Sequence, residues 1–186
     1  WYPYMHNPSN AHRAWASGRR LGLYGGSDGH RRNPGLGGGL TGVWAIELTQ
    51  SGLLEAFASR RTYATQGCRP QLRFELADET GASLILGEHG DLSGRLAARI
   101  DIRLADSDPG RLVLVELKQG DRVLHNWEAS DFLRDGRECR IEQPLAPKAP
   151  PSHLYQTEMK EPYYVYVRAR LSGPDREYAY NAAASR

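Results

Sequence analysis

The feature that most constrains the fold of this 186-residue chain is the alternation of apolar and polar residues in its C-terminal two thirds. Residues 71–77, 95–104 and 163–171 alternate for their whole length, and residues 111–118 form a nearly continuous apolar run. Because alternate side chains of a strand point to opposite faces, each alternating stretch predicts a strand with one buried face. Several such strands separated by turn residues predict an antiparallel β-sandwich over residues 68–186.

The last two strands are expected to form a hairpin. In residues 163–171 the alternation places Val165, Val167, Ala169 and Leu171 toward the core and Tyr164, Tyr166, Arg168 and Arg170 on the opposite face. Residues 177–180 would pair with this strand across the turn sequence Ser-Gly-Pro-Asp at 172–175. The proline-rich residues 146–153 are expected to form a surface loop.

Residues 1–67 mix helical and strand patterns. A short helix is expected after a run of capping residues, ending near Gly18, and a second helix should begin at Thr49. Short apolar runs at 21–26 and 43–48 predict two strands. A strand, a loop and a strand that leads into a helix are typical of an α/β domain. The apolar face of the second helix would consist of Leu53, Leu54, Phe57 and Ala58.

Composition excludes several classes of partner. The chain has 24 Lys and Arg against 22 Asp and Glu, a net charge of +2, with no dense basic run, so no nucleic-acid partner is expected. No stretch approaches the ~20 apolar residues that a membrane-spanning helix needs. The two cysteines, Cys68 and Cys139, rule out a disulfide framework and a CxxC metal motif.

The candidate chemistry lies in residues 22–35, GLYGGSDGHRRNPG. Asp28 and His30 are two residues apart, so on an extended chain their side chains point to the same side. A carboxylate and an imidazole that point together are two ligands of a divalent metal site. Serine, aspartate and glycine are also ordinary turn residues, and this short motif alone is compatible with a polar turn.

A longer set of motifs resembles a known family. Gly-Ser-Asp-x-His at 26–30, the Pro-Gly pair at 34–35, Glu-Leu-Thr at 47–49 and Arg-Arg-x-Tyr-Ala-Thr-x-Gly at 60–67 occur in this order. This order resembles PHP-type metallohydrolases, the polymerase and histidinol phosphatase superfamily, and within them the carbaryl (carbamate ester) hydrolase-like branch. The resemblance implies an α+β chain: a terminal β/α unit of a distorted β/α barrel in residues 1–67, followed by an antiparallel β-sandwich in residues 68–186.

The resemblance also implies a reaction. Asp28 and His30 would bind a divalent metal (zinc, manganese or iron), Asp28 would also act as a general base, and metal-bound hydroxide would hydrolyse an ester, carbamate or phosphoester of small-molecule size. The family's His-x-His motif is absent from this sequence. A missing N-terminal barrel segment is therefore expected before Trp1, and the 186-residue chain alone is expected to be inactive.

Other interpretations stay open at this point. The chain could be a non-catalytic β-sandwich that binds another molecule, or its barrel could be completed by a second chain. The glycine-rich residues 33–42 are expected to form a loop, either a lid over substrate or a plain connection. Arg31 and Arg32 could attract an anionic substrate, or they could be solvated surface residues. The other histidines, His6, His12, His89, His125 and His153, are taken as structural.

Overall fold

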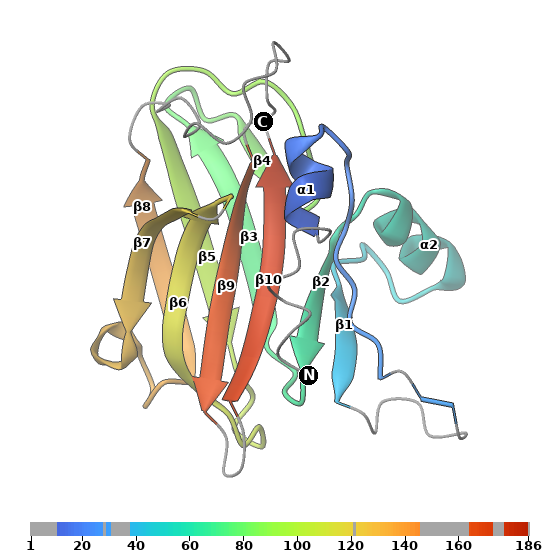
Figure 1. Ribbon diagram of the computed structural model, residues 1–186, viewed down its shortest axis with the longest axis vertical. Helices are drawn as coiled ribbons and strands as arrows, with labels where there is room; N and C mark the ends of the chain where they lie inside the picture. The colour runs from blue at the N-terminus through green and yellow to red at the C-terminus, as the bar shows by residue number, and fades with distance from the viewer. Residues whose placement is uncertain are drawn as a thin grey trace.

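In the computed structural model, two antiparallel sheets pack face to face (Figure 1). The structure describes residues 11–27, 29–30, 38–120, 122–145, 164–172 and 177–185. Within these residues, one sheet has six strands in the order β1-β2-β10-β9-β6-β7, and the other has four in the order β4-β3-β5-β8.

The elements follow one another along the chain with these bounds: α1 (Ala11–Ala16), β1 (Gly39–Val43), α2 (Gln50–Ala58), β2 (Thr62–Gln66), β3 (Gln71–Asp78), β4 (Ser83–Ile85), β5 (Leu96–Arg103), β6 (Arg111–Gln119), β7 (Arg122–Glu128), η2 (Ala129–Asp131), β8 (Glu138–Pro144), β9 (Tyr164–Ser172) and β10 (Glu177–Ser185).

The core lies between the two sheets, where the predicted alternation is confirmed. Strand β3 buries Leu72, Phe74 and Leu76, and β5 buries every second residue from Leu96 to Ile102. The inward side chains of β9 are those expected from the sequence, Val165, Val167, Ala169 and Leu171, and they belong to the same core cluster. Strand β10 pairs antiparallel with β9, Glu177 opposite Ser172, so the expected hairpin pairing is confirmed.

The expected β/α barrel unit in the N-terminal part is wrong. Strands β1 and β2 pair antiparallel, with Gly39 opposite Gln66 and Val43 opposite Thr62, and β2 continues the sheet next to β10. A β/α barrel unit joins parallel strands through its helix, whereas α2 here connects two antiparallel neighbours. No barrel is formed by the described residues, and strands from both sides of residue 67 share one sheet.

Two strand positions in the N-terminal part also differ from the prediction. Residues 21–26 form no regular strand, and 44–48, predicted as most of a strand, follow the end of β1 as irregular backbone. The observed strand instead begins at Gly39, inside the stretch expected to be a loop. Glycine and threonine carry little apolar bulk, so β1 shows no alternation of apolar and polar residues from which a strand could be predicted. This strand contributes mainly through its backbone pairing.

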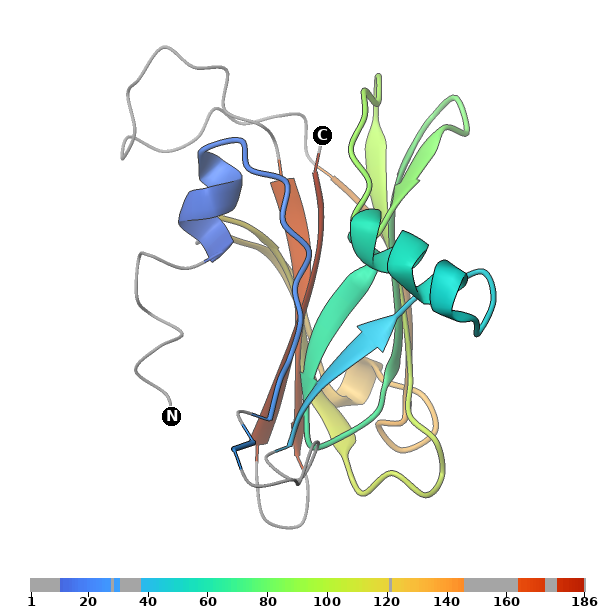
Figure 2. The same ribbon diagram turned by 90° about the vertical axis from the view of Figure 1, so that its right-hand side faces the viewer.

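The two helices begin and end as the sequence suggests. Thr49 caps α2, its hydroxyl accepting a hydrogen bond from the Gly52 N–H at 3.1 Å. Helix α1 ends before Gly18, which has a φ of 79°. It packs on the outer face of the six-stranded sheet (Figure 2), where the Trp15 ring lies 5.5 Å from the ring of Tyr164.

Tyr63 of β2 links the two sheets. Its ring is buried in the shared core, and its hydroxyl donates to the Pro70 carbonyl at 2.7 Å, immediately before β3. The same hydroxyl accepts a hydrogen bond from the Leu72 N–H at 3.4 Å. The ring lies over Gly42 of β1, where any added methyl group would overlap it. Burial raises the pKa of Tyr63, partly offset by the Leu72 N–H, so the phenol stays protonated.

A β-carbon at position 42 should therefore destabilise the sandwich. We expect Gly42→Ala to lower the free energy of unfolding by about 1–3 kcal/mol, because the buried ring of Tyr63 has to shift. Urea unfolding followed by circular dichroism measures this difference. Gly26→Ala is the matched control, because a methyl group there meets no atom within 4 Å. Equal midpoints for the two variants would contradict the contact between Gly42 and Tyr63.

Asp78 organises the turn that follows β3. One carboxylate oxygen accepts hydrogen bonds from the Thr80 hydroxyl at 2.7 Å, the Thr80 N–H at 2.9 Å and the Ala82 N–H at 3.1 Å. The other oxygen accepts from the Ser93 N–H at 3.1 Å. These bonds, led by the one from the Thr80 hydroxyl, lower the pKa of Asp78 from 3.8 to about 2. The ionised carboxylate thus stabilises the folded chain.

The lowered pKa predicts how stability depends on pH. The contribution of Asp78 is complete above its ordinary pKa of 3.8 and is lost as the pH falls toward the folded value of about 2. We expect Asp78→Asn to lower the melting temperature at pH 6 and to differ less from the wild type at pH 2. Asp91→Asn, in an exposed position of the same region, is the control. A deficit for Asp78→Asn that is unchanged from pH 6 to pH 2 would contradict the charge-based role.

Candidate functional site

The segment that carries the predicted metal ligands runs along the edge of the sandwich. The Gly25 N–H donates to the Thr41 hydroxyl at 3.1 Å, and that hydroxyl donates to the Gly25 carbonyl at 2.9 Å. His30 is exposed four residues beyond Gly26, whereas Asp28 lies outside the described residues. The path of the chain toward the motif is therefore fixed to β1 up to Gly26.

Two glycines permit this close approach. A side chain at Gly25 would overlap the backbone of Leu40, and one at Gly39 would overlap the backbone of Gly26. The glycine-rich stretch that the sequence suggested as a lid or connection thus supplies part of β1 from Gly39 onward. Residues 31–37, which include Arg31, Arg32 and Gly37, lie outside the described residues.

Other metal-ligating side chains do not gather around His30 in the described part of the chain. Among those residues, no group of three or more His, Cys, Asp and Glu side chains is placed to hold a metal. Asp28 lies outside the described residues, so the geometry of the Asp28–His30 pair stays a prediction from the sequence. The two donor types still suit zinc, manganese or iron, but a catalytic zinc usually has ~3 protein ligands.

Two of the other histidines contact neighbouring side chains. The Nδ1 atom of His89 lies 3.4 Å from Nη2 of Arg60, and His125 packs against the Trp127 ring at a centroid distance of 4.6 Å. Partial burial lowers the pKa of His89, and the guanidinium groups of Arg20 and Arg60 lower it further. His6 and His153 lie outside the described residues.

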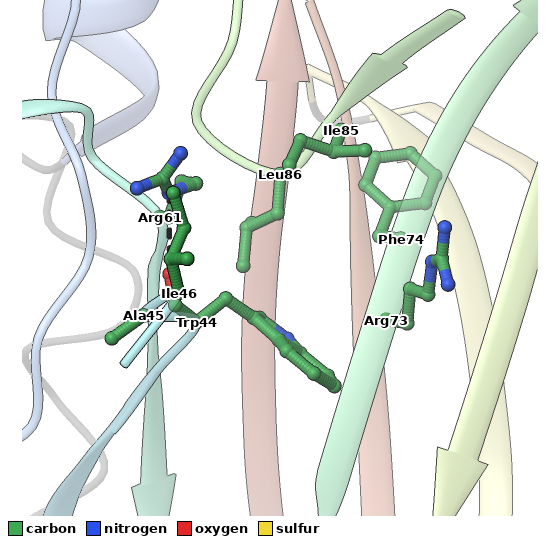
Figure 3. A pocket seen from close by; sticks show the side chains of 8 residues that line it. All are labelled: Trp44, Ala45, Ile46, Arg61, Arg73, Phe74, Ile85 and Leu86. Carbon is green, nitrogen blue, oxygen red and sulfur yellow. Dashed lines mark hydrogen bonds between the residues drawn. The ribbon is translucent and has the colours of Figure 1, made fainter. Parts of the chain in front are cut away.

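The structure also contains an apolar pocket that the sequence did not indicate. Its volume is about 180 Å³, and it lies where the stretch after β1 meets β3 and the end of β4 (Figure 3). The residues that line it are Trp44, Ala45, Ile46, Arg61, Arg73, Phe74, Ile85 and Leu86. We call it the Trp44 pocket. Its walls come from segments up to 42 residues apart, so no local motif could have revealed it.

Hydrogen bonds fix the shape of the Trp44 pocket. The Trp44 indole N–H donates to the Leu72 carbonyl at 2.6 Å, which holds the ring against β3. Nε of Arg61 donates to the Trp44 carbonyl at 3.2 Å, and the same guanidinium forms an ion pair with Glu55 of α2. Because both arginine contacts are internal, Arg61 positions the wall of the pocket and α2 together.

The turn after α2 ties this helix to the other sheet. Arg60 has a φ of 59°, in the left-handed region that few side chains adopt. Its Nε donates to the Gly87 carbonyl at 3.1 Å, and a side chain at Gly87 would overlap the Arg60 backbone. The left-handed turn is therefore stabilised by contact with the loop after β4, and α2 is held across the edge of the sandwich (Figure 2).

Large apolar side chains are exposed on α2 and in the residues just before it. The exposed fractions are 86 % for Ile46, 91 % for Leu48, 61 % for Leu54 and 49 % for Phe57. We call these four residues, which lie on α2 or just before it, the α2 patch. Of the helix itself only Ala56 is buried. The apolar helix face expected from the sequence thus exists but does not face the core.

The two cysteines take no part in either site. Cys68 and Cys139 form no disulfide and are buried in the shared core. Burial, followed by the charges of Asp101 and Asp131, raises the pKa of Cys139 to about 12. A thiol needs its thiolate form to react, so the Cys139 side chain is inert near neutral pH.

No helix in the described part of the chain is long and apolar enough to span a membrane. A protein-family model described as "Protein of unknown function (DUF3604)" matches residues 7–81, a stretch that includes α1, the Asp28–His30 motif, the α2 patch and β3. That description assigns no activity. No curated protein and no solved structure matches the sequence.

Proposed function

We propose that the chain is the C-terminal portion of a metal-dependent hydrolase that acts on a small-molecule ester, carbamate or phosphoester. Asp28 and His30 would hold a divalent metal together with further ligands from residues outside this chain's sequence. We call the residues that supply those further ligands the catalytic part of the protein. The resemblance of the ordered motifs in residues 18–67 to PHP-type metallohydrolases supports this reaction class.

One structural observation carries the proposal. The residues that lead to the motif are fixed to the sandwich edge by the Gly25–Thr41 hydrogen bonds, and the described His30 beyond them is exposed. The imidazole thus lies at the surface, on a segment whose approach is positioned by the sandwich. A carboxylate and an imidazole fit the donor preferences of zinc, manganese and iron, although two donors make an incomplete set.

The residues of this chain would have separate roles. A bound divalent metal lowers the pKa of a water ligand and polarises the substrate oxygen. His30 would hold the metal through a neutral ring nitrogen. Asp28 would provide negative charge and accept the proton of the attacking water. The sandwich would position the motif without contributing to the chemistry.

A second candidate function is a binding module without catalysis. The specific observation in its favour is the combination of the Trp44 pocket with the uncovered α2 patch, neither of which the hydrolysis reaction needs. Metal content and turnover distinguish the two functions, since a binding module requires neither.

The proposed reaction predicts distinct effects of three substitutions. In the form of the protein that carries the catalytic part, His30→Ala should reduce metal content and lower turnover at least about 100-fold, more than the loss of a supporting residue. Asp28→Asn keeps the shape but loses the charge, so it should also weaken metal binding and turnover. His125→Ala, on the far edge strand β7, is the matched control. Elemental analysis and turnover of a generic ester and phosphoester provide the measurements.

The 186-residue chain alone provides a second test of the same proposal. With two donors it should bind zinc or manganese weakly and show no measurable hydrolysis. Full metal occupancy and activity in both His30→Ala and Asp28→Asn would contradict the ligand roles and support a polar turn at this motif.

A further inference from the structure

We infer that the Trp44 pocket is a binding site for a small aromatic carboxylate, a molecule with one six-membered ring joined to a carboxylate group. The residues that line this pocket include neither Asp28 nor His30, and the site needs no metal. The inference therefore does not rest on the hydrolase proposal. It names the class of ligand that a binding function of this chain would use.

The first argument is the size of the pocket. An apolar cavity of about 150 Å³ can hold one benzene molecule, whereas sites for drug-sized ligands measure about 300–1,000 Å³. The Trp44 pocket, at about 180 Å³, has room for one ring. It opens to solvent beside Trp44 and Ile46, whose exposed fractions are 39 % and 86 %. A polar group attached to the ring would therefore lie at the mouth of the pocket.

The second argument is the aromatic wall that Trp44 provides. Its indole N–H donates to the Leu72 carbonyl at 2.6 Å, and its own carbonyl accepts from Nε of Arg61 at 3.2 Å. Figure 3 shows the Trp44 ring and the Leu86 side chain on two sides of the hollow. A ligand ring between them would contact an indole ring and aliphatic groups, as aromatic ligands favour. Because the Trp44 ring is already held in place, binding would cost little conformational entropy.

The third argument is the charge of the groups around the hollow. The main-chain and indole groups of Trp44 are bonded inside the protein, and the Leu86 N–H donates to the Phe74 carbonyl at 3.0 Å. Of the eight described residues that line the pocket, two are charged, and both are arginines. Arg61 and Arg73 lie on opposite sides of the hollow (Figure 3). The polar group of the ligand should therefore be an anion.

Arg73 is the arginine placed to bind that anion. Its side chain is 64 % exposed, and its Nη2 lies 3.6 Å from Oε2 of Glu75, too far for a direct hydrogen bond. Glu75 is shared with Arg99, whose Nη1 donates to Oε1 at 3.2 Å. The side chain of Arg61, by contrast, is 14 % exposed and is paired with Glu55. A ligand carboxylate could thus bind Arg73 without displacing the hydrogen bond between Arg99 and Glu75.

Two matched probes test the inference in the 186-residue chain. Phenylacetate presents one ring and a carboxylate, and phenylacetamide has nearly the same shape without the charge. The chain contains four tryptophans, and Trp44→Phe identifies the indole N–H resonance of Trp44 in a proton–nitrogen correlation spectrum. The titrations are run with a chelator present, so that a metal ion cannot contribute to the binding of phenylacetate.

Phenylacetate should shift the Trp44 resonance in a saturable manner and leave that of Trp127, on the opposite edge strand β7, unchanged. Phenylacetamide should bind at least about threefold more weakly, because it lacks the charge that pairs with an exposed arginine. Arg73→Met keeps an apolar side chain without the charge and should remove this preference. Arg99→Met is the matched control and should keep the preference, since Arg99 contacts the same Glu75 but does not line the pocket.

Three results would overturn the inference. These are the lack of a saturable Trp44 shift with phenylacetate, equal affinities of the wild type for the two probes, and a loss of preference in Arg99→Met as large as that in Arg73→Met. Broadening of the Trp44 resonance with rising protein concentration, before any probe is added, would also overturn it, because a second copy of the chain would then occupy the pocket. Since metal is absent throughout, each of these outcomes leaves the hydrolase proposal to its own test of metal content and turnover.

Discussion

The structure depends most on the contacts of one buried phenol. Tyr63 belongs to the six-stranded sheet, yet its hydroxyl is bonded to Pro70 and Leu72, where the four-stranded sheet begins. A buried hydroxyl without these bonds would be costly, so the two sheets are linked at this point. The ring also requires Gly42 beneath it, which places β1 beside β2. Helix α2 connects these two strands along the chain, so its position follows from their pairing.

The contacts of Tyr63 join residues that are far from any local pattern, which explains why the sequence predicted the C-terminal strands but not the pairing of β1 with β2. In β5 the period-two alternation identified the buried residues, and in β9 it identified those that face the shared core. It did not indicate that Tyr164 and Tyr166, on the opposite face of β9, are buried against Trp15. In β1 the sequence Gly-Leu-Thr-Gly-Val carries little apolar bulk, because its glycines serve close contacts with Gly26 and Tyr63. Local patterns also cannot tell which strand lies beside which. A strand, a loop and a strand leading into a helix were therefore taken for part of an α/β domain, and with the resemblance for a barrel unit, whereas β1 and β2 are antiparallel neighbours.

Part of the candidate site could likewise be predicted from the sequence, and part could not. The Asp28–His30 motif could be found from the sequence because its meaning lies in spacing and residue type. The Trp44 pocket could not, since Trp44, Phe74 and Leu86 meet only after both sheets have formed. The apolar face of α2 was visible in the sequence, but the direction it faces depends on the Arg60–Gly87 contact. One physical account connects the two regions: the edge formed by β1 carries the segment leading to His30 at one end and the α2 patch at the other.

The central claim is that residues 39–66 are an integral part of the sandwich, and native-state hydrogen exchange at increasing urea concentration tests it most directly. Strands that unfold together exchange through one opening with the same free energy and the same dependence on urea. The account predicts that the amides of β2 join those of β9 in a single global unfolding event, because β10 pairs with both strands. Exchange of the β2 amides through a separate, smaller opening, while β9 stays protected, would contradict it.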